Sequence, residues 1–426
     1  MRVLKVISGY PPLYVAGSEI YSQTLCEALA ARGHEVDVFT GAQDPYRPDF
    51  EVEMTQEAER LRVHRVNLPR GRDVVRQEGV DAALIELVER ARPDVAHVGH
   101  LFYLSMGIVG ALADLGVPVV FTLHDFWLMC PRGQFLQTNY GQRPFHQLCD
   151  GQDDRKCALR CFNSHFTGEP DTFERDLEYW TGHVGRRMEA ARRVVERVGR
   201  FIAPSRHLRE RFIEGFGVDE ARIELLNYGF EAARLGLPPE RPGGPMRFGY
   251  IGTHSPSKGI DLLIEAFAGV TAPAELLIFG HPRYQSTASL EAMARRCPNP
   301  VRFMGGYDHR RIVEEVFAHV DCVVVPSIWV ENSPLVIHEA QGCRVPVITA
   351  DVGGMAEHVE HEVNGLRFVH RDAGSLRQQL DRAARDLALM RRLGRRGHLH
   401  HPDGDIPGIG EHCDRIEAIY RALVEA

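Results

Sequence analysis

Lysine is scarce in this sequence of 426 residues, in which Lys5, Lys156 and Lys258 are the only lysines among 50 basic residues. Arginine carries the remaining positive charge, and the two side chains are not equivalent where a compact point charge is needed. Acidic residues number 58, so the formal net charge is −8. A negative balance of this size argues against general nucleic-acid binding.

Long apolar runs are also missing, and none approaches the length that spans a membrane. Residues 1–8 read as a strand rather than as the apolar part of a signal peptide. Nine cysteines in a chain of this length do not indicate a secreted disulfide scaffold. We therefore expect a soluble, cytoplasmic protein. An arginine-rich helical segment, 185–199, could contact anionic lipid at the inner membrane face, although its interspersed glutamates favour a solvated surface.

The length of the chain favours two domains, because a single core rarely grows to this size. Both halves alternate apolar strands with amphipathic helices, which indicates α/β domains with parallel sheets. A linker rich in proline and glycine is expected at 227–230 and 237–245. Expected strands span 3–8, 35–40, 61–66, 94–98, 117–124, 201–205, 246–252, 275–279, 301–304, 321–326, 345–349 and 366–369, and expected first-half helices 18–32, 81–92, 104–115 and 176–199.

One segment places two carboxylates around the start of an expected helix. It follows residues 320–325, a β-branched run typical of a buried parallel strand. Ser333 offers an N-cap hydroxyl and Pro334 suits the first helical position. Glu331 precedes them in the loop, where backbone N–H groups favour anions. Glu339 is on an apolar face, where a polyhydroxyl ligand would satisfy it. Alone, each glutamate could equally be solvated or ion-paired.

The loop after the strand 246–252 ends in Lys258 at a helix start. A cation at a helix N-terminus is unfavourable unless an anion shares the site. A bound diphosphate therefore explains the lysine at this position more simply than a role as an ordinary surface residue does. No D-x-D string accompanies this loop. The first loop of the chain ends in Gly17 and Ser18, which allow close approach of an anion, although a plain turn explains them too. No G-x-G-x-x-G dinucleotide fingerprint occurs there.

An insertion from 126 to about 176 lacks apolar periodicity. It contains cysteines that could hold a structural zinc ion, with free buried thiols as the alternative. Loops of this length are usually functional or disordered, and its aromatic content favours order. We expect the insertion to shape an acceptor pocket. The cysteines are Cys130, Cys149, Cys157 and Cys161, and the aromatic residues are Phe126, Trp127, Phe135, Tyr140, Phe145, Phe162 and Phe166.

The segment 326–340 resembles the donor-binding signature of the retaining family-4 glycosyltransferases, whose E-x7-E pair is filled by Glu331 and Glu339. The resemblance implies that Glu331 holds the donor hexose and Glu339 the nucleotide ribose. It also implies that neighbouring residues line the donor site, namely Asn332, Ser333, Pro334 and Leu335.

Other loops extend this resemblance over most of the chain. Residues 252–259 resemble the family's G-R-x4-K-G loop, whose two cations clamp the donor diphosphate. Lys258 keeps the lysine, but Thr253 replaces the arginine, so one charge is missing. His124, within a T-x-H-D string, resembles the active-site histidine beside the donor sugar, and Asp125 is expected to orient it. The loop ending in Gly17 and Ser18 resembles the family's first glycine loop.

The resemblance implies a GT-B fold, an α/β architecture of two Rossmann-like domains whose parallel sheets face each other across a cleft. The expected domains are 1–227 on the acceptor side and 228–410 on the donor side, with 411–426 a helix that returns to the first domain. The implied activity is retaining transfer from a nucleotide-diphosphate sugar, with a UDP-sugar expected, to a hydroxyl of a small-molecule, glycan or lipid-linked acceptor. His124, Glu331 and Lys258 would be the catalytic residues, with no metal or cofactor required.

Two alternatives remain open at this point. A sugar-nucleotide epimerase of the same fold would release an altered sugar without any acceptor. A catalytically weak subunit would bind a nucleotide and a partner enzyme without turnover. Thr253 favours this alternative, because it lacks the positive charge of the arginine that the family has at this position.

Overall fold

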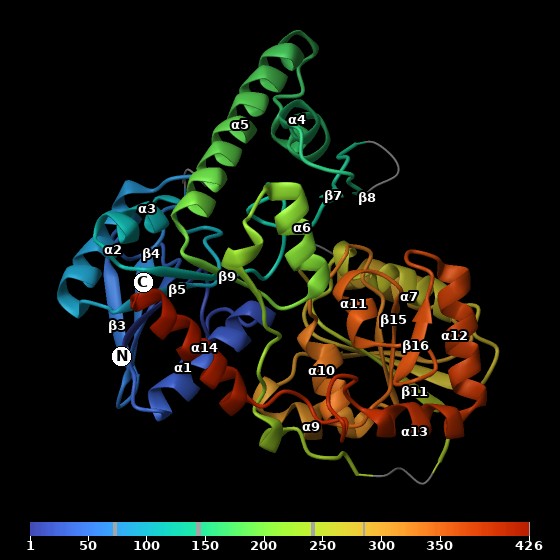
Figure 1. The fold of residues 1–426 in the computed structure, drawn as a ribbon. Coiled ribbons are helices and arrows are strands. Elements are labelled where there is room, and N and C mark those ends of the chain that lie inside the picture. The colour runs from blue at the N-terminus through green and yellow to red at the C-terminus, as the bar shows by residue number, and fades with distance from the viewer. Residues whose placement is uncertain (71–74, 142–145, 240–242, 284–285, 426) are drawn as a thin grey trace. The chain divides into compact units, whose positions relative to one another are not determined.

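The computed structural model describes residues 1–70, 75–141, 146–239, 243–283 and 286–425. Part of the expected linker and Phe145 of the insertion lie outside these residues. The chain forms two compact units, Met1–Phe230 with Gly408–Ala426, and Glu231–Pro407 (Figure 1). Each unit has its own largely parallel sheet, so the predicted α/β architecture is confirmed.

The first unit is built on an eight-stranded sheet in the order β10-β9-β6-β5-β1-β2-β4-β3. Its central strands are buried at nearly every position, as expected of parallel strands covered on both faces. The strands are β1 Arg2–Ile7, β2 Glu35–Ala42, β3 Val52–Ala58, β4 Leu61–Asn67, β5 Val95–Val98, β6 Val119–Thr122, β9 Arg200–Ala203 and β10 Ile223–Leu225. Its helices include α1 Gly17–Ala31, α2 Glu78–Ala91, α3 Gly107–Asp114, α5 Phe173–Arg197 and α6 Arg206–Phe216.

The final helix, α14 (Ile409–Val424), belongs to the first unit, where it lies beside α1 (Figure 1). Its polar contacts are long-range: His412 Nε2 lies 2.9 Å from Tyr21 Oη, and Tyr420 Oη lies 2.6 Å from the Nδ1 atom of His97. Tyr420 is completely buried. Helix α14 therefore supplies part of the core of the first unit.

The second unit has a six-stranded sheet, entirely parallel, in the order β13-β12-β11-β14-β15-β16. Its core is formed by residues of this unit alone. The strands are β11 Met246–Ile251, β12 Ala274–Phe279, β13 Val301–Gly305, β14 Cys322–Val325, β15 Val347–Ala350 and β16 Gly365–Phe368. The helices are α7 Ile260–Phe267, α8 Thr287–Ala294, α9 Ile312–Glu315, α10 Leu335–Gly342, α11 Gly353–His358, α12 Ala373–Arg385 and α13 Leu387–Arg396.

Two strands of the eight-stranded sheet were not predicted from the sequence. β3 pairs antiparallel with β4 at the sheet edge, and nearly all of its residues are exposed. Since strand prediction depends on apolar residues that recur on a buried face, an edge strand without such a face gives little signal. β10 has only three residues, which is too short for any periodicity.

The insertion is more regular than its sequence suggested. It contains a short hairpin, β7 (Leu136–Gln137) with β8 (Gln147–Leu148), and the helix α4 (Asp154–Cys161). The Asp153 side chain caps α4 by accepting a hydrogen bond from the Lys156 N–H. The buried residues of α4 are two cysteines and one alanine, so its apolar face was too narrow to be recognised.

The arginine-rich end of α5 is only partly the solvated surface that was expected. Arg186, Arg192, Arg193 and Arg197 are exposed. Arg187 is buried at 4% exposure, stacks over the Trp127 ring at 4.6 Å and donates hydrogen bonds to main-chain carbonyls of the insertion. No helix in the described part of the chain is sufficiently long and apolar to cross a membrane.

Candidate functional site

The second unit has a topological switch point between β11 and β14. The chain leaves β11 towards β12 on one side and leaves β14 towards β15 on the other. Ligands of open parallel sheets bind at such points, beyond the carboxyl ends of the strands. The loop after β11 carries Lys258 and the loop after β14 carries Glu331. Lys258 Nζ lies 2.7 Å from Glu331 Oε1, so the two predicted residues meet at this edge of the sheet.

Close packing of the two loops depends on Gly259. Its φ is +69°, and a Cβ atom there would lie 2.0 Å from the Pro326 carbonyl oxygen. The Ile328 N–H also donates a 3.0 Å hydrogen bond to the Ser257 carbonyl. A side chain at Gly259 would force these loops apart, because both the conformation and the space exclude it.

The ion pair between Lys258 and Glu331 is unequally exposed. Glu331 is 5% exposed and also accepts a hydrogen bond from the Ser327 hydroxyl. The Lys258 side chain is 34% exposed, and its Nζ atom lies 5.6 Å from the centroid of the Trp329 ring. An ammonium group has three donors, so Lys258 can hold Glu331 and still offer N–H groups to an anion.

The second glutamate of the pair, Glu339, has a partner that the sequence analysis missed. His309 Nε2 lies 2.6 Å from Glu339 Oε1, and Glu339 is 5% exposed. Burial lowers the pKa of His309, but the hydrogen bond and charge of Glu339 outweigh it and leave that pKa raised. The Gly305-Gly306 pair at the end of β13 lies just before His309 and is the nearest feature of the sequence that indicates a turn.

Ser333 does not cap the helix as predicted. Helix α10 begins at Leu335, and Pro334 is its extended N-cap residue with no side-chain capping bond. Ser333 Oγ instead lies 2.8 Å from His338 Nε2 and 3.1 Å from His358 Nε2. The N-cap prediction for Ser333 is wrong because its hydroxyl contacts two buried imidazoles instead, one on α10 and one on α11.

The remaining predicted donor residues lie around the same loops. Asn332 is buried, and the Gly354 N–H at the start of α11 donates a 2.9 Å hydrogen bond to the Glu331 carbonyl. Thr253 is half-buried, and its carbonyl accepts a 2.7 Å hydrogen bond from Tyr250. Its side chain brings no positive charge to the loop.

In the first unit, His124 follows β6, whose neighbour β5 lies next to β1. Its Nδ1 atom lies 2.8 Å from Tyr228 Oη, and the two rings stack. Burial lowers the pKa of His124 well below its usual value, so the imidazole is neutral. Tyr228 was recognised only as part of the linker.

Asp125, predicted to orient His124, contacts Trp127 and His100. Its Oδ1 atom accepts a 2.7 Å hydrogen bond from the Trp127 N–H, and its Oδ2 atom lies 3.4 Å from His100 Nε2. The carboxylate thus caps the turn that begins the insertion. The ring nitrogen of His124 is held by Tyr228 instead.

Gly17 and Ser18 open helix α1, as expected for a first glycine loop. The N-cap residue Ala16 makes no side-chain capping bond, and the Ser18 hydroxyl donates to Glu19 Oε2 at 2.8 Å. Gly17 is exposed. The N–H groups of this first turn are therefore not capped by the Ala16 side chain, and an anion could take that place.

The four cysteines of the insertion form no disulfide. Cys157 and Cys161 are one turn apart on α4, and both are buried together with Cys130, whereas Cys149 is less so. Burial raises the pKa of Cys157 to about 12 and that of Cys161 to about 11. All four cysteines are among the residues that the structure describes, and no three of their sulfur atoms lie within 4.8 Å of one another.

Two family models match the chain and together cover most of it. Residues 15–234 match the model described as Glycosyltransferase Family 4, and residues 238–400 match the model described as Glycosyl transferases group 1.

Curated relatives match along nearly the whole chain. A glycogen synthase of Mycobacterium tuberculosis (strain CDC 1551 / Oshkosh) is 24% identical over 416 residues, covering 93% of this chain and 89% of the relative. A D-inositol 3-phosphate glycosyltransferase of Gordonia bronchialis is 26% identical over 415 residues, covering 90% and 80%.

Solved structures of GT-B glycosyltransferases have the same fold. Sucrose-phosphate synthase from Thermosynechococcus elongatus superposes with a TM-score of 0.69 at 21% identity, over 99% of both chains. HepE of Anabaena in complex with UDP-glucose gives a TM-score of 0.66 at 16% identity, over 99% of this chain and all of HepE.

Proposed function

Because the chain belongs to the family-4 glycosyltransferases, as its motifs predicted, we propose that it transfers a sugar from a nucleotide-diphosphate sugar to an acceptor hydroxyl with retention of configuration. The observation that carries this proposal is the 2.7 Å contact between Lys258 and Glu331 at the switch point of the second unit. A cation and a hydroxyl-binding carboxylate at one sheet edge suit a diphosphate joined to a sugar.

Three residues of the second unit, Lys258, Glu331 and Glu339, have separate roles in this proposal. Lys258 stabilises the negative charge that develops on the departing diphosphate, which is the main electrostatic demand of the reaction. Glu331 accepts hydroxyl groups of the donor sugar. Glu339 binds His309 through one carboxylate oxygen and accepts a hydrogen bond from a ribose hydroxyl at the other. Helix N-termini add backbone N–H groups, with Gly17 and Ser18 of the first unit among them.

His124 is the group of the first unit proposed to lie beside the donor sugar. Its hydrogen bond from Nδ1 to Tyr228 fixes the ring, and a neutral imidazole can bind a sugar hydroxyl at its second nitrogen. The family resemblance supports a retaining course without a covalent enzyme intermediate.

A UDP-sugar is the proposed donor, in keeping with HepE, whose solved structures include complexes with UDP and UDP-glucose. We propose that transfer needs no divalent metal, because the partly exposed Lys258 ammonium supplies a positive charge that can neutralise the diphosphate. The insertion is proposed to contact the acceptor, and its cysteines to hold a structural zinc ion.

The test combines binding with product analysis. A panel of nucleotide sugars is screened by thermal unfolding, since specific ligands stabilise the folded chain. The stabilising sugar is then assayed with hydroxyl acceptors in EDTA, and the anomeric configuration of the product is read by NMR. Retention is expected, with no gain on adding Mg²⁺ or Mn²⁺.

Lys258→Met is expected to abolish both stabilisation and transfer, whereas Lys156→Met serves as the matched control for stabilisation by the nucleotide sugar. Lys156 also forms an ion pair, 2.6 Å from Asp150, but lies in the insertion of the other unit. Release of an altered sugar without acceptor would identify an epimerase. Tight nucleotide binding without turnover would identify the weak subunit that Thr253 suggested.

A further inference from the structure

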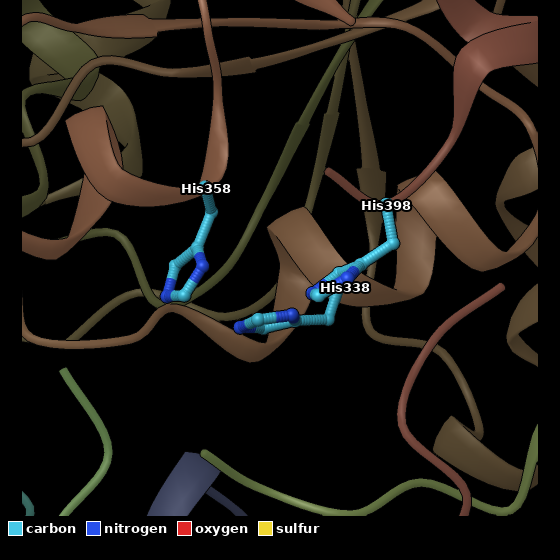
Figure 2. A group of neighbouring side chains, drawn as sticks. All are labelled: His338, His358 and His398. Atoms are coloured by element: carbon cyan, nitrogen blue, oxygen red, sulfur yellow. The ribbon is translucent and has the colours of Figure 1, made fainter. Parts of the chain in front are cut away.

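Three histidines of the second unit converge in its interior without a role in the proposed transfer. His338 lies on α10, His358 ends α11 and His398 follows α13, and Figure 2 shows their rings turned towards a common centre. Their exposed fractions are 0%, 3% and 2%. Their ligand atoms lie within 4.8 Å of one another, the one such group of three or more among the residues that the structure describes.

Two ring nitrogens of this cluster are buried but form no hydrogen bond. His358 Nδ1 and His398 Nε2 are buried and have no hydrogen-bond partner. Buried polar atoms are nearly always paired, so such atoms in a native interior call for an explanation. Burial also lowers the pKa of His358 to about 3 and that of His398 to about 4, which keeps both rings in the neutral form that binds metal ions.

The opposite nitrogens of two rings already have the environment of metal-bound histidines. His338 Nε2 and His358 Nε2 both contact Ser333 Oγ, at 2.8 and 3.1 Å. A hydroxyl oxygen has two lone pairs, so it can accept an N–H from both rings at once. In that tautomer each Nδ1 carries the lone pair that a metal ion binds. Metal-ligating histidines characteristically donate their second N–H to such a partner.

The backbone that carries two of the histidines is tied together by one buried amide. Asn364 is 1% exposed, and its Nδ2 atom donates to the His358 carbonyl at 2.9 Å and to the Gly397 carbonyl at 3.1 Å. Gln341 Nε2 donates a further 2.7 Å bond to the His358 carbonyl. The elements are thus held in place independently of the imidazoles.

We propose that His338, His358 and His398 bind a first-row transition metal ion, with zinc the expected occupant. Imidazole ligands suit Zn²⁺, Cu²⁺ and Ni²⁺, and an all-imidazole set disfavours Mg²⁺ and Ca²⁺. Zinc–nitrogen bonds of about 2.0–2.1 Å put tetrahedral ligands roughly 3.4 Å apart, so the rings draw inwards on binding. The ion connects α10, α11 and the segment after α13, next to Ser333, whose hydroxyl contacts two of the three histidines.

Simple packing of neutral rings is the competing explanation. The His338 and His398 rings lie 5.5 Å apart and are nearly parallel, at 30°, as in a stacked pair. The His400 N–H also contacts His398 Nδ1 at 3.4 Å, a long contact that metal binding at Nε2 would replace. Packing alone leaves the buried nitrogens of His358 and His398 without partners, and a metal ion satisfies both.

The test uses the full chain, stripped of metal with a chelator and then titrated with Zn²⁺ during thermal unfolding. One equivalent bound at this site is expected to raise the unfolding temperature. Titration with Co²⁺ distinguishes the ligands, because nitrogen ligands give visible d–d bands without the sulfur charge-transfer band that the insertion's cysteines would add. This measurement on the natural chain needs no variant to fold.

His398→Gln is expected to weaken Zn²⁺ binding at least tenfold and to remove the thiolate-free Co²⁺ spectrum. His319→Gln, at an exposed histidine of the same unit, is the matched control. The proposal is overturned if the natural chain binds no Zn²⁺ or Co²⁺. It is equally overturned if His398→Gln binds as the natural chain does, or if Cys157→Ser with Cys161→Ser abolishes all binding.

Discussion

Lys5 and Lys258 have opposite surroundings. The Lys258 ammonium is partly exposed and paired with a carboxylate. Lys5, on the central strand β1, is 1% exposed, and its Nζ atom has no hydrogen-bond partner. Burial lowers the pKa of Lys5 to about 8. A buried ammonium without a partner destabilises the folded state, so the two lysines differ in their effect on stability.

The pKa of Lys5 predicts a rise in stability at alkaline pH. Unfolded lysine titrates near pH 10.4, so between about pH 8 and 10.4 the unfolded chain holds a proton that the folded chain has released. Stability therefore increases with pH across this window, by roughly 3 kcal/mol in total. Urea unfolding of the natural chain and of Lys5→Met from pH 7 to 10.5 checks it. Lys5→Met should be the more stable at pH 7, and a constant difference between the two chains would contradict the assignment.

Glu339→Gln tests the ribose-binding role at the same scale. Loss of a charge-assisted hydrogen bond is expected to weaken nucleoside diphosphate binding by about 1.5–3 kcal/mol, measured by calorimetry. Because Glu339 raises the pKa of His309, that pKa should also fall, which NMR titration can follow. Glu314→Gln, at an exposed residue of α9, is the control. Unchanged affinity, with the His309 shift present, would remove Glu339 from the ribose role.

At the scale of elements, parallel strands were predictable and the groups that meet at their ends were not. A buried run such as β14 gives a strong apolar signal at consecutive positions. The motif resemblance also identified Lys258 and Glu331. His309, the partner of Glu339, and Tyr228, the partner of His124, escaped prediction, because a hydrogen bond between distant loops leaves no trace in local sequence. Ser333 was misassigned because its hydroxyl contacts two buried histidines, His338 and His358, that come from two helices.

The loop of Glu331 is held by helix α11, and Gly354→Ala should displace it. A Cβ atom at Gly354 would lie 1.1 Å from the Asn332 carbonyl oxygen, and the Gly354 N–H bonds the Glu331 carbonyl. We expect a loss of stability of about 1–3 kcal/mol, typical of forced overpacking, and weaker nucleotide-sugar binding. Gly110→Ala in helix α3, where nothing lies within 4 Å, should instead be neutral or stabilising. Equal unfolding curves and donor affinities for both variants would refute this account.

The insertion predicts a separation of transfer from donor hydrolysis. Serine at Cys130, Cys149, Cys157 and Cys161 removes any zinc ligand and loosens α4 against α5. If the insertion binds the acceptor, transfer falls and the acceptor KM rises, while slow hydrolysis of the donor persists. Kinetics with and without acceptor measure both rates, with Cys297→Ser in the second unit as control. Normal transfer in the quadruple variant would leave the insertion without an acceptor role.

At the scale of the whole molecule, the two units differ in how the chain builds them. The second unit is one continuous segment, Glu231–Pro407, whose core draws on no other residues. The first unit needs two segments, because α14 returns to it from the far end of the sequence. The family resemblance predicted the returning final helix, but its packing partners, such as Tyr21 and His97, were fixed only by the three-dimensional arrangement.

Cutting the chain at these boundaries should therefore give unequal products. Residues 231–407 alone are expected to unfold cooperatively and to bind the nucleotide sugar nearly as tightly as the full chain, yet to transfer nothing, since His124 is absent. Residues 1–230 lack the buried side chains of Cys413, Ile416 and Tyr420, each 0% exposed. Losing large core side chains costs about 2–5 kcal/mol apiece, which together approaches the whole stability of a typical domain of about 5–15 kcal/mol. Circular dichroism and calorimetry of both fragments measure this asymmetry. A stable 1–230 fragment would contradict the role of α14 in the core of the first unit. A 231–407 fragment that folds but binds no nucleotide sugar would show that the donor site does not reside where Lys258 and Glu331 meet.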